Sequence, residues 1–206
     1  MGAAVDSISP LREFVVAMTR LVERGGDEAL LMREGRALLK QLIATDDWLP
    51  DAFAQPHPQF YQQYLLHADP LGRFSVVSFV WGPGQRTPIH DHTVWGLIGM
   101  LRGAERGVRY QREADGRLVQ SGDGEVLQVG EIDMVSPTIG DVHLVANAVE
   151  DQPSISIHVY GANIGAVVRH VFDPKTGEAK PFVSGYSSTS VPNLWDCSAT
   201  VRAGLE

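Results

Sequence analysis

A series of short runs rich in β-branched and aromatic residues, beginning at Phe60, constrains the fold of this chain more than any other sequence feature. Turn-forming residues separate the runs, as in Ala114-Asp115-Gly116 and Gly122-Asp123-Gly124. Many short strands at close spacing indicate a β-sandwich or a β-barrel. The predicted strands span residues 60–67, 73–81, 95–101, 107–111, 118–120, 126–129, 132–135, 142–146, 154–160 and 167–172.

The N-terminal part of the chain has helical periodicity instead. Ser9 and Pro10 are typical of an N-cap and a first helical position, and Gly25-Gly26 would end that helix. Asp27 can cap a second helix, and Asp46-Asp47-Trp48-Leu49-Pro50 indicates a further short helical turn. The apolar stripes are Leu11, Phe14, Val15, Met18, Leu21 and Val22, then Leu30, Leu31, Leu38, Leu39, Leu42 and Ile43. We expect a helical subdomain that packs on a sheet.

Length and composition fit one globular domain. The chain has 206 residues, of which 44% are apolar and 20% charged, which is ordinary for a soluble protein with a buried core. We expect a helical cap at about 1–55, a barrel at about 60–172 and a C-terminal segment, 173–206, that wraps the outside.

Charge and cysteine content narrow the classes of function. A net charge of -8 without a block of Lys or Arg argues against nucleic acid and anionic membranes as partners. Cys197 is the single cysteine, so no disulfide can form within the chain. There is neither a signal-peptide pattern nor a long apolar run, and we expect a cytoplasmic protein. The oligomeric state stays open.

The pattern His90-Asp91-His92 indicates chemistry most directly. On an extended strand His90 and His92 project from the same face, while Asp91 points away and receives no role. Paired neutral imidazoles suit iron, copper, nickel or zinc rather than calcium or magnesium. A third ligand must come from elsewhere. The remaining histidines interpreted as structural are His57, His67 and His170.

The spacing around this pair resembles the two sequence motifs of the cupin superfamily. The matching residues are Gly84, His90, His92, Gly96 and Gly103, then Gly130, Pro137, Gly140, His143 and Asn147. The interval from Pro137 to Gly140 is one residue longer than the commonest form. The resemblance implies a mostly β fold, a jelly-roll-like cupin barrel here joined to an N-terminal helical subdomain. It also assigns His143 as the third metal ligand.

Gly96 stands where the usual cupin motif has a glutamate ligand. Three neutral histidines would leave a metal its full formal charge and, in an octahedral geometry, three adjacent open positions. Such a cation can accept an anionic sulfur, a second substrate atom and dioxygen together. Three histidines and a water would also suit catalytic zinc, so the ligands alone do not name the metal.

The run Ser154-Ile155-Ser156-Ile157-His158-Val159-Tyr160 alternates polar and apolar residues. By period two, Ser156, His158 and Tyr160 share one face of the strand. They could form a hydrogen-bond relay in a cavity, or simply the polar outer face of a sandwich strand. A serine hydrolase is not favoured, because the chain has no Gly-x-Ser-x-Gly elbow.

A three-histidine cupin with a Ser-x-His-x-Tyr strand resembles the cysteine dioxygenase family of thiol dioxygenases, over about residues 61–169. In that family Fe(II) held by three histidines adds both atoms of dioxygen to a thiol and gives a sulfinic acid. The resemblance implies Fe(II) bound by His90, His92 and His143, with catalytic roles for Ser156, His158 and Tyr160.

Two departures from the animal cysteine dioxygenases indicate a bacterial branch. Those enzymes carry a cysteine after the histidine pair, linked to the tyrosine, whereas this chain has Trp95-Gly96 there. Their early-strand arginine is replaced by Gln63, with Gln62 as the less favoured candidate. Together with Arg169, nine residues beyond Tyr160, this resembles the bacterial 3-mercaptopropionate dioxygenases.

The resemblance thus implies oxidation of a small mercapto-carboxylic acid by dioxygen. 3-Mercaptopropionate is the favoured substrate, with cysteine and mercaptosuccinate as alternatives. Arg169 would bind the carboxylate bidentately, and Gln63 would close the pocket. Two other classes stay open: a non-catalytic metal-binding or sensor cupin, and a different metal-dependent cupin enzyme such as an isomerase.

Overall fold

Two antiparallel helices form the N-terminal part of the structure, a computed structural model that describes residues 8–188 and 198–205. They are α1 (Ser9–Arg24) and α2 (Glu28–Leu42). Asp27 caps α2 as predicted, its Oδ1 accepting a hydrogen bond from Leu30 N at 2.8 Å. The cap predicted at Ser9 is wrong, because Ser9 lies inside α1 and Ile8 stands at the N-cap. Pro10 tolerates this placement, since its missing N–H needs no partner in a first turn.

The helical turn predicted at 46–50 lies further along the chain. It is the 3₁₀ helix η1 (Asp51–Phe53), with Pro50 at its N-cap. A residue before proline is pushed out of helical conformations, so the turn begins only after Pro50. Trp48 is buried between α2 and η1, where its indole N–H donates to Leu42 O at 2.9 Å.

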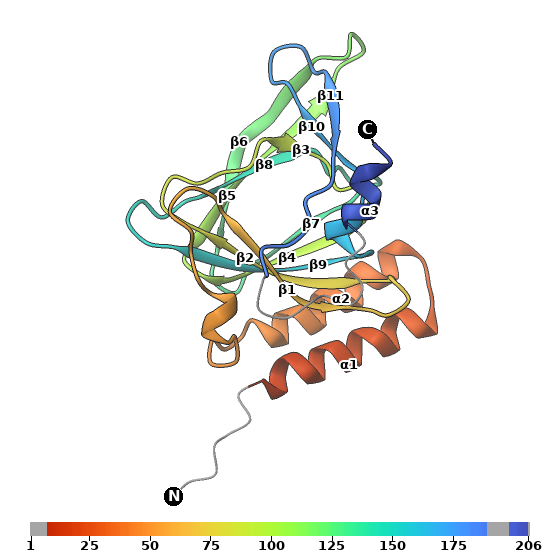
Figure 1. The fold of residues 1–206 in the computed structure, drawn as a ribbon, viewed down its shortest axis with the longest axis vertical. Coiled ribbons are helices and arrows are strands. Elements are labelled where there is room, and N and C mark those ends of the chain that lie inside the picture. Colours follow the sequence, from red (N-terminus) through yellow and green to blue (C-terminus); the bar gives the residue numbers. More distant parts are fainter. Residues whose placement is uncertain (1–7, 189–197, 206) are drawn as a thin grey trace, which may run out of the picture.

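The strands form two antiparallel sheets that enclose a barrel (Figure 1). The five-stranded sheet has the order β1-β2-β9-β4-β7, and the six-stranded sheet the order β11-β10-β3-β8-β5-β6. The bounds are β1 (Gln62–Ala68), β2 (Ser75–Trp81), β3 (Ile89–His90), β4 (Gly96–Arg102), β5 (Ala104–Arg112), β6 (Leu118–Gln128), β7 (Ile132–Val135), β8 (His143–Asn147), β9 (Ser154–Tyr160), β10 (Arg169–Phe172) and β11 (Ala179–Phe182). Two further short helices are η2 (Ile164–Ala166), between β9 and β10, and α3 (Ser198–Ala203), after β11. The predicted mostly β cupin architecture with N-terminal helices is confirmed.

Three strands differ from the prediction. β6 is one strand rather than the two expected at 118–120 and 126–129, because both halves pair with β5. Gly122 (φ 75°) and Gly124 (φ 82°) adopt left-handed conformations, and the register with β5 shifts between Gly107 and Arg109. β3 and β11 were not predicted. β3 has two residues, too few to show alternation, and β11 lies in the tail expected to wrap the outside.

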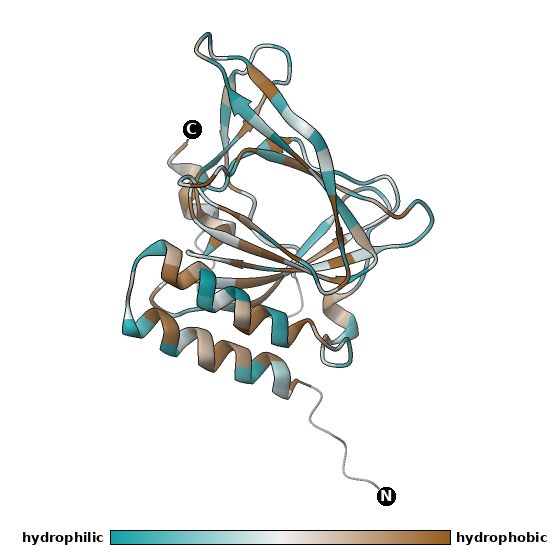
Figure 2. Cartoon of the chain, turned by 180° about the vertical axis from the view of Figure 1, so that it is seen from behind, coloured by the Kyte–Doolittle hydropathy of each residue, from teal (hydrophilic) through white to brown (hydrophobic). Residues whose placement is uncertain are grey.

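The helices cover the outer face of the five-stranded sheet (Figures 1 and 2). Ile155, Ile157 and Val159 of β9 belong to the core shared with α1 and α2. Gly99 allows α2 to approach closely, since a Cβ there would lie 3.0 Å from Ile43 Cδ1. Because the helices cover one face of β9, the opposite face, which carries Ser156, is turned toward the barrel interior.

Within the described residues, no helix combines the length and apolar character required to cross a membrane.

Candidate metal centre

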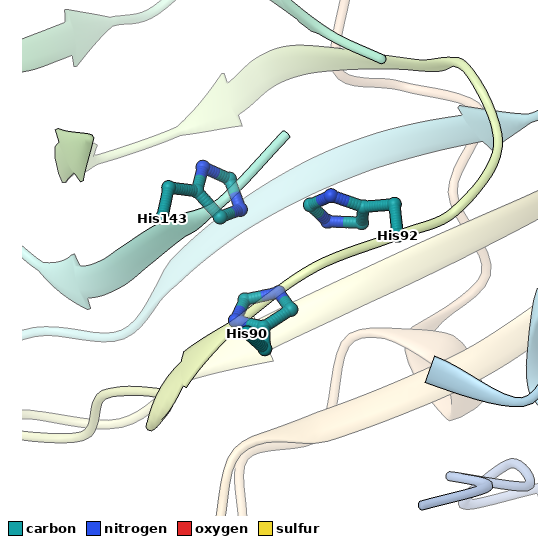
Figure 3. Close-up of side chains that lie close together, drawn as sticks. All are labelled: His90, His92 and His143. Atoms are coloured by element: carbon teal, nitrogen blue, oxygen red, sulfur yellow. The ribbon is translucent and has the colours of Figure 1, made fainter. Parts of the chain in front are cut away.

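Three histidine side chains converge inside the barrel (Figure 3). His90 on β3 and His143 on β8 are direct partners across the six-stranded sheet, and His92 follows in the loop after β3. One nitrogen from each ring lies within 4.8 Å of the others, and all three residues are buried. Strand pairing thus brings together two ligands that are far apart in sequence, and the loop adds the third.

The hydrogen bonds of two rings fix their tautomers. Nδ1 of His90 lies 3.1 Å from Pro88 O, and Nδ1 of His92 lies 3.1 Å from Asp141 O. A backbone carbonyl can only accept, so both Nδ1 atoms carry the proton. Each Nε2 therefore keeps a free lone pair for a metal ion.

Electrostatics keep the three rings neutral. Burial, helped by the charge of Arg169, lowers the pKa of His90 to about 4. Burial and the neighbouring imidazoles hold the pKa values of His92 and His143 well below the usual histidine range. Neutral imidazoles bind a cation without first losing a proton, so these residues fit a transition-metal ion.

Gly96 explains why no carboxylate joins the histidines. It is paired with Tyr160 across β4 and β9. A Cβ at position 96 would lie 2.9 Å from the Tyr160 ring and 3.0 Å from Val135 Cγ2. The Tyr160 ring therefore occupies the space that a glutamate side chain would need.

The loop that carries His92 is organised by Asp141, which the sequence did not single out. Its Oδ2 accepts hydrogen bonds from the backbone N–H of His92 and of Thr93, both at 3.0 Å. Thr93 has a φ of 58°, unusual for a residue with a side chain. No local pattern signals this contact, because the carboxylate lies 49 residues along the chain.

Asp91, left without a role by the sequence, binds His170. Its two carboxylate oxygens accept from His170 N at 2.7 Å and contact His170 Nδ1 at 2.8 Å. The pair ties the end of β3 to β10, next to the three converging histidines. The purely structural interpretation of His170 agrees with this contact.

Ser156, His158 and Tyr160 form a continuous hydrogen-bonded row. Ser156 Oγ lies 2.7 Å from His158 Nε2, and His158 Nδ1 lies 2.8 Å from Tyr160 Oη. All three are buried, so the alternative of a polar outer face is wrong. The His158 ring also stacks on Phe79, with centroids 4.1 Å apart.

The row extends to two residues that sequence reasoning missed. Ser156 Oγ donates to Glu105 Oε1 of β5 and accepts from Trp81 Nε1 at 3.2 Å. Glu105 is only 2% exposed. Nothing in the sequence of β5 marks Glu105 as a member of this row, because its partner Ser156 lies on a strand of the other sheet.

A cavity of about 180 Å³ joins the histidines to the row. Arg169 lines it, 4% exposed, with its guanidinium over the Phe182 ring at 4.7 Å. NH2 of Arg169 donates to Ser184 Oγ at 2.7 Å, whereas its buried Nε has no hydrogen-bond partner among the residues that the structure describes. Tyr61, Phe79 and Trp81 form an aromatic wall of the same cavity.

Of the two candidate glutamines, Gln63 lines the cavity. Its Nε2 donates to Gly185 O at 2.8 Å, which ties β1 to the segment after β11. The amide of Gln62 donates instead to the backbone oxygens of Phe60 and Tyr61. Cys197 lies outside the described residues.

A β-barrel with three buried histidines placed to hold a metal ion is thus what the fold and the site define. The sequence profile of cysteine dioxygenase type I matches residues 37–173. This chain therefore belongs to the cysteine dioxygenase type I family.

Individual relatives carry the same name at low identity. Cysteine dioxygenase type 1 of Bos taurus is 25% identical over 120 residues, which are 57% of this chain and 58% of that protein. That of Homo sapiens is 28% identical over 109 residues, 52% of each chain. That of Danio rerio is 28% identical over 136 residues, 64% of each. The chain thus spans between half and two-thirds of the length of these relatives.

Solved structures give weaker similarities. A protein with a double-stranded β-helix domain from Klebsiella pneumoniae has 20% identity and a TM-score of 0.45, covering 56% of this chain and 84% of that one. A cupin superfamily protein from Desulfitobacterium hafniense has 13% identity and a TM-score of 0.42, covering 56% and 90%.

Proposed function

We propose that this protein is a non-haem Fe(II) thiol dioxygenase that converts 3-mercaptopropionate and O2 to the sulfinic acid. The proposal rests on one observation above all: a buried guanidinium, with one N–H that has no partner within residues 8–188 and 198–205, faces the cavity that holds three neutral imidazoles. A small anion that also carries a metal-binding atom would satisfy both groups. Membership of the cysteine dioxygenase type I family supports a thiol as that atom.

The size and charge of the cavity favour a monocarboxylate. Its volume of about 180 Å³ corresponds to about six waters at ~30 Å³ each, which suits a molecule of few heavy atoms. Among the described residues that line it, Arg169 is the only permanent charge, and no Asp or Glu is present. The ammonium of cysteine would lack an anionic partner, and the second carboxylate of mercaptosuccinate would lack a cation.

Fe(II) bound by His90, His92 and His143 would hold the thiol sulfur and activate dioxygen. The protein's own groups supply orientation and proton positions. Arg169 binds the substrate carboxylate, and Tyr160 presents its hydroxyl to the cavity beside it. The aromatic wall excludes bulk water, while Gln63 closes the pocket through its bond to Gly185.

The test combines metal analysis with an oxygen electrode. We expect iron in the purified protein and oxygen uptake that is fastest with 3-mercaptopropionate, compared with cysteine, mercaptosuccinate and cysteamine. His143→Ala should lose the metal, whereas His57→Ala, a change at an exposed histidine, should keep it. Bound iron without thiol-driven oxygen uptake would instead indicate a sensor. Turnover that continues without oxygen would indicate another metal-dependent enzyme.

A further inference from the structure

Glu105 is a buried acid with no counter-ion in direct contact in the described part of the chain. Its carboxylate meets the Ser156 hydroxyl and the Trp81 indole N–H, both neutral groups. Arg109, which shares the same face of β5, is ion-paired with Asp133 at 2.5 Å. A buried carboxylate held only by neutral donors is costly when ionised, and acids perturbed in this way cluster at functional sites.

An ionised Glu105 would fix the direction of the whole row. Each contact along it holds one hydrogen, and Ser156 has a single hydroxyl proton. A carboxylate can only accept, so Ser156 donates to Glu105 and must accept from His158 Nε2–H. The neutral His158 ring then has a bare Nδ1, and the Tyr160 hydroxyl donates to it.

A protonated Glu105 allows the opposite direction. The carboxyl O–H can donate to Ser156 Oγ, which frees the Ser156 proton for His158 Nε2. His158 then carries its proton on Nδ1 and donates it to Tyr160 Oη. The hydroxyl proton of Tyr160 is released to point into the cavity with the three histidines. Trp81 N–H only donates and is compatible with both arrangements.

We propose that Glu105 is the terminal proton-holding residue of a four-membered relay, and that its protonation state sets whether the Tyr160 hydroxyl donates toward the cavity or toward His158. One proton taken up at Tyr160 Oη moves the tyrosine proton to His158 Nδ1. The Nε2 proton of His158 moves to Ser156, and the Ser156 proton moves to Glu105. The relay gains one proton in total, and neither His158 nor Tyr160 becomes charged.

A second cavity connects the far end of the relay to solvent. It has a volume of about 680 Å³, and its lining includes Glu105, side chains of α2 and of β4 to β7, and His143 and Val145 of β8, which also line the substrate cavity. Exposed side chains such as Glu125 stand on its rim. Water there can exchange protons with Glu105, at the end of the relay opposite Tyr160.

The electrostatic surroundings place this exchange at neutral pH. Burial, with the nearby charge of Asp133, raises the pKa of Glu105 to about 7, although the Ser156 and Trp81 hydrogen bonds oppose the rise. Burial lowers the pKa of His158 to about 3, so this ring stays neutral throughout. The other titratable and charged groups around the relay and the second cavity, among the described residues, are Arg36, Lys40, Tyr61, His90, His92, Arg109, Asp123, Glu125, Glu131, Asp133, His143, Arg169 and Tyr186.

The direct test is the tautomer of His158, read by long-range proton–nitrogen NMR correlations of the ¹⁵N-histidine-labelled full chain. The site is loaded with zinc, which is diamagnetic. We expect Nδ1–H at about pH 5 and Nε2–H at about pH 9, with the change near the Glu105 pKa. One tautomer at both pH values would overturn the proposal.

Variants assign the change to Glu105. Glu105→Gln should abolish the pH-dependent switch, while Glu125→Gln, a carboxylate on the rim of the same cavity, should keep it. A switch that persists in Glu105→Gln would contradict the relay. Should that variant not fold, Glu105→Asp keeps a titrating carboxylate but places it at a different distance from Ser156. The tautomer switch of this variant should then occur at a shifted pH, and an unchanged midpoint of the switch would contradict the proposal.

The consequence for turnover, unlike the tautomer switch, rests on the proposed function. An ionised Glu105 would accept, through the relay, the proton that a substrate thiol loses. We expect kcat to rise with pH through neutrality, and Glu105→Gln to flatten that rise and lower kcat about 10–100-fold with little change in KM. A pH profile identical to that of the wild type would contradict the relay. An inactive wild type with an intact tautomer switch would refute the dioxygenase alone.

Discussion

At the residue scale, Gly96 decides which side chains can surround the metal ion. Its missing Cβ leaves room for the Tyr160 ring, which stacks beside His92 with centroids 5.6 Å apart. The same position therefore removes a carboxylate ligand and admits the phenol that ends the relay. One glycine couples the metal site to the hydrogen-bonded row.

Gly96→Ala should destabilise the protein by about 1–3 kcal/mol, because the new methyl group would press on the Tyr160 ring and Val135. Chemical denaturation of the metal-free protein measures this change. Gly107→Ala is the matched control on β5, since nothing lies within 4 Å of its Cβ position. Equal stability of the two variants would show that the Tyr160 contact is not tight.

Glu105 should make folding stability fall as pH rises. Its pKa of about 7 lies above the ordinary value of 4.5, so the folded state binds the proton more tightly than the unfolded state. The contribution of this group to the free energy of unfolding is then greatest below about pH 4.5. About 3 kcal/mol of that contribution is lost as pH rises past about 7. Urea unfolding at several pH values should show this slope in the wild type, and Glu105→Gln should lack it.

Under the proposed function, Tyr160→Phe should slow thiol turnover about 10–100-fold, because the hydrogen-bonded row would lose its hydroxyl at the cavity. Bound iron should stay nearly unchanged, since the phenol is not among the three metal-binding side chains. Oxygen uptake and metal analysis of the same sample measure both effects. Tyr110→Phe, on the six-stranded sheet away from the cavity, serves as control, and loss of iron from Tyr160→Phe would contradict this role.

At the scale of elements, the segment between β3 and β4 determines how accurately His92 is positioned beside His90 and His143. It leaves the six-stranded sheet at His90 and enters the five-stranded sheet at Gly96. Asp141 holds its middle through two backbone N–H groups, and Asp91 fastens its start to β10. His92 is thus positioned by the carboxylate of the distant Asp141 and by that of its neighbour Asp91.

Asp141→Ala should weaken metal binding about 10–100-fold, the usual cost of removing a group that orients a ligand. Competition with a chromophoric chelator gives the affinity. Asp151→Ala, in an exposed turn, removes the same charge without touching the loop and should leave the affinity unchanged. Equal affinities for both variants would show that the loop holds His92 without Asp141.

At the scale of the molecule, a bound metal ion would join the two sheets. His90 and His143 belong to the six-stranded sheet, while His92 sits on the segment that crosses to the other sheet. A ligand that binds only the folded state stabilises it by mass action, here by holding the two sheets together.

Saturating zinc, at about 100 times its dissociation constant, should add about 2.7 kcal/mol of stability. For a chain of this length that corresponds to a rise in Tm of about 5–10 °C. Differential scanning calorimetry with and without zinc measures the shift. His92→Ala should abolish it, His57→Ala should retain it, and a shift that survives in His92→Ala would place the metal elsewhere.

The sequence by itself determined what depends on local periodicity: the mostly β architecture, the helical stripes, and the shared face of Ser156, His158 and Tyr160. Resemblance to a motif added His143 to the histidine pair. Only the tertiary structure decided which side chains lie opposite one another. Glu105 meets Ser156 across 51 residues, Asp141 meets His92 across 49, and Gly185 meets Gln63 across 122. The physical reason is that alternation along a strand fixes the face of a side chain, whereas its partner on that face is set by how distant strands pair and pack.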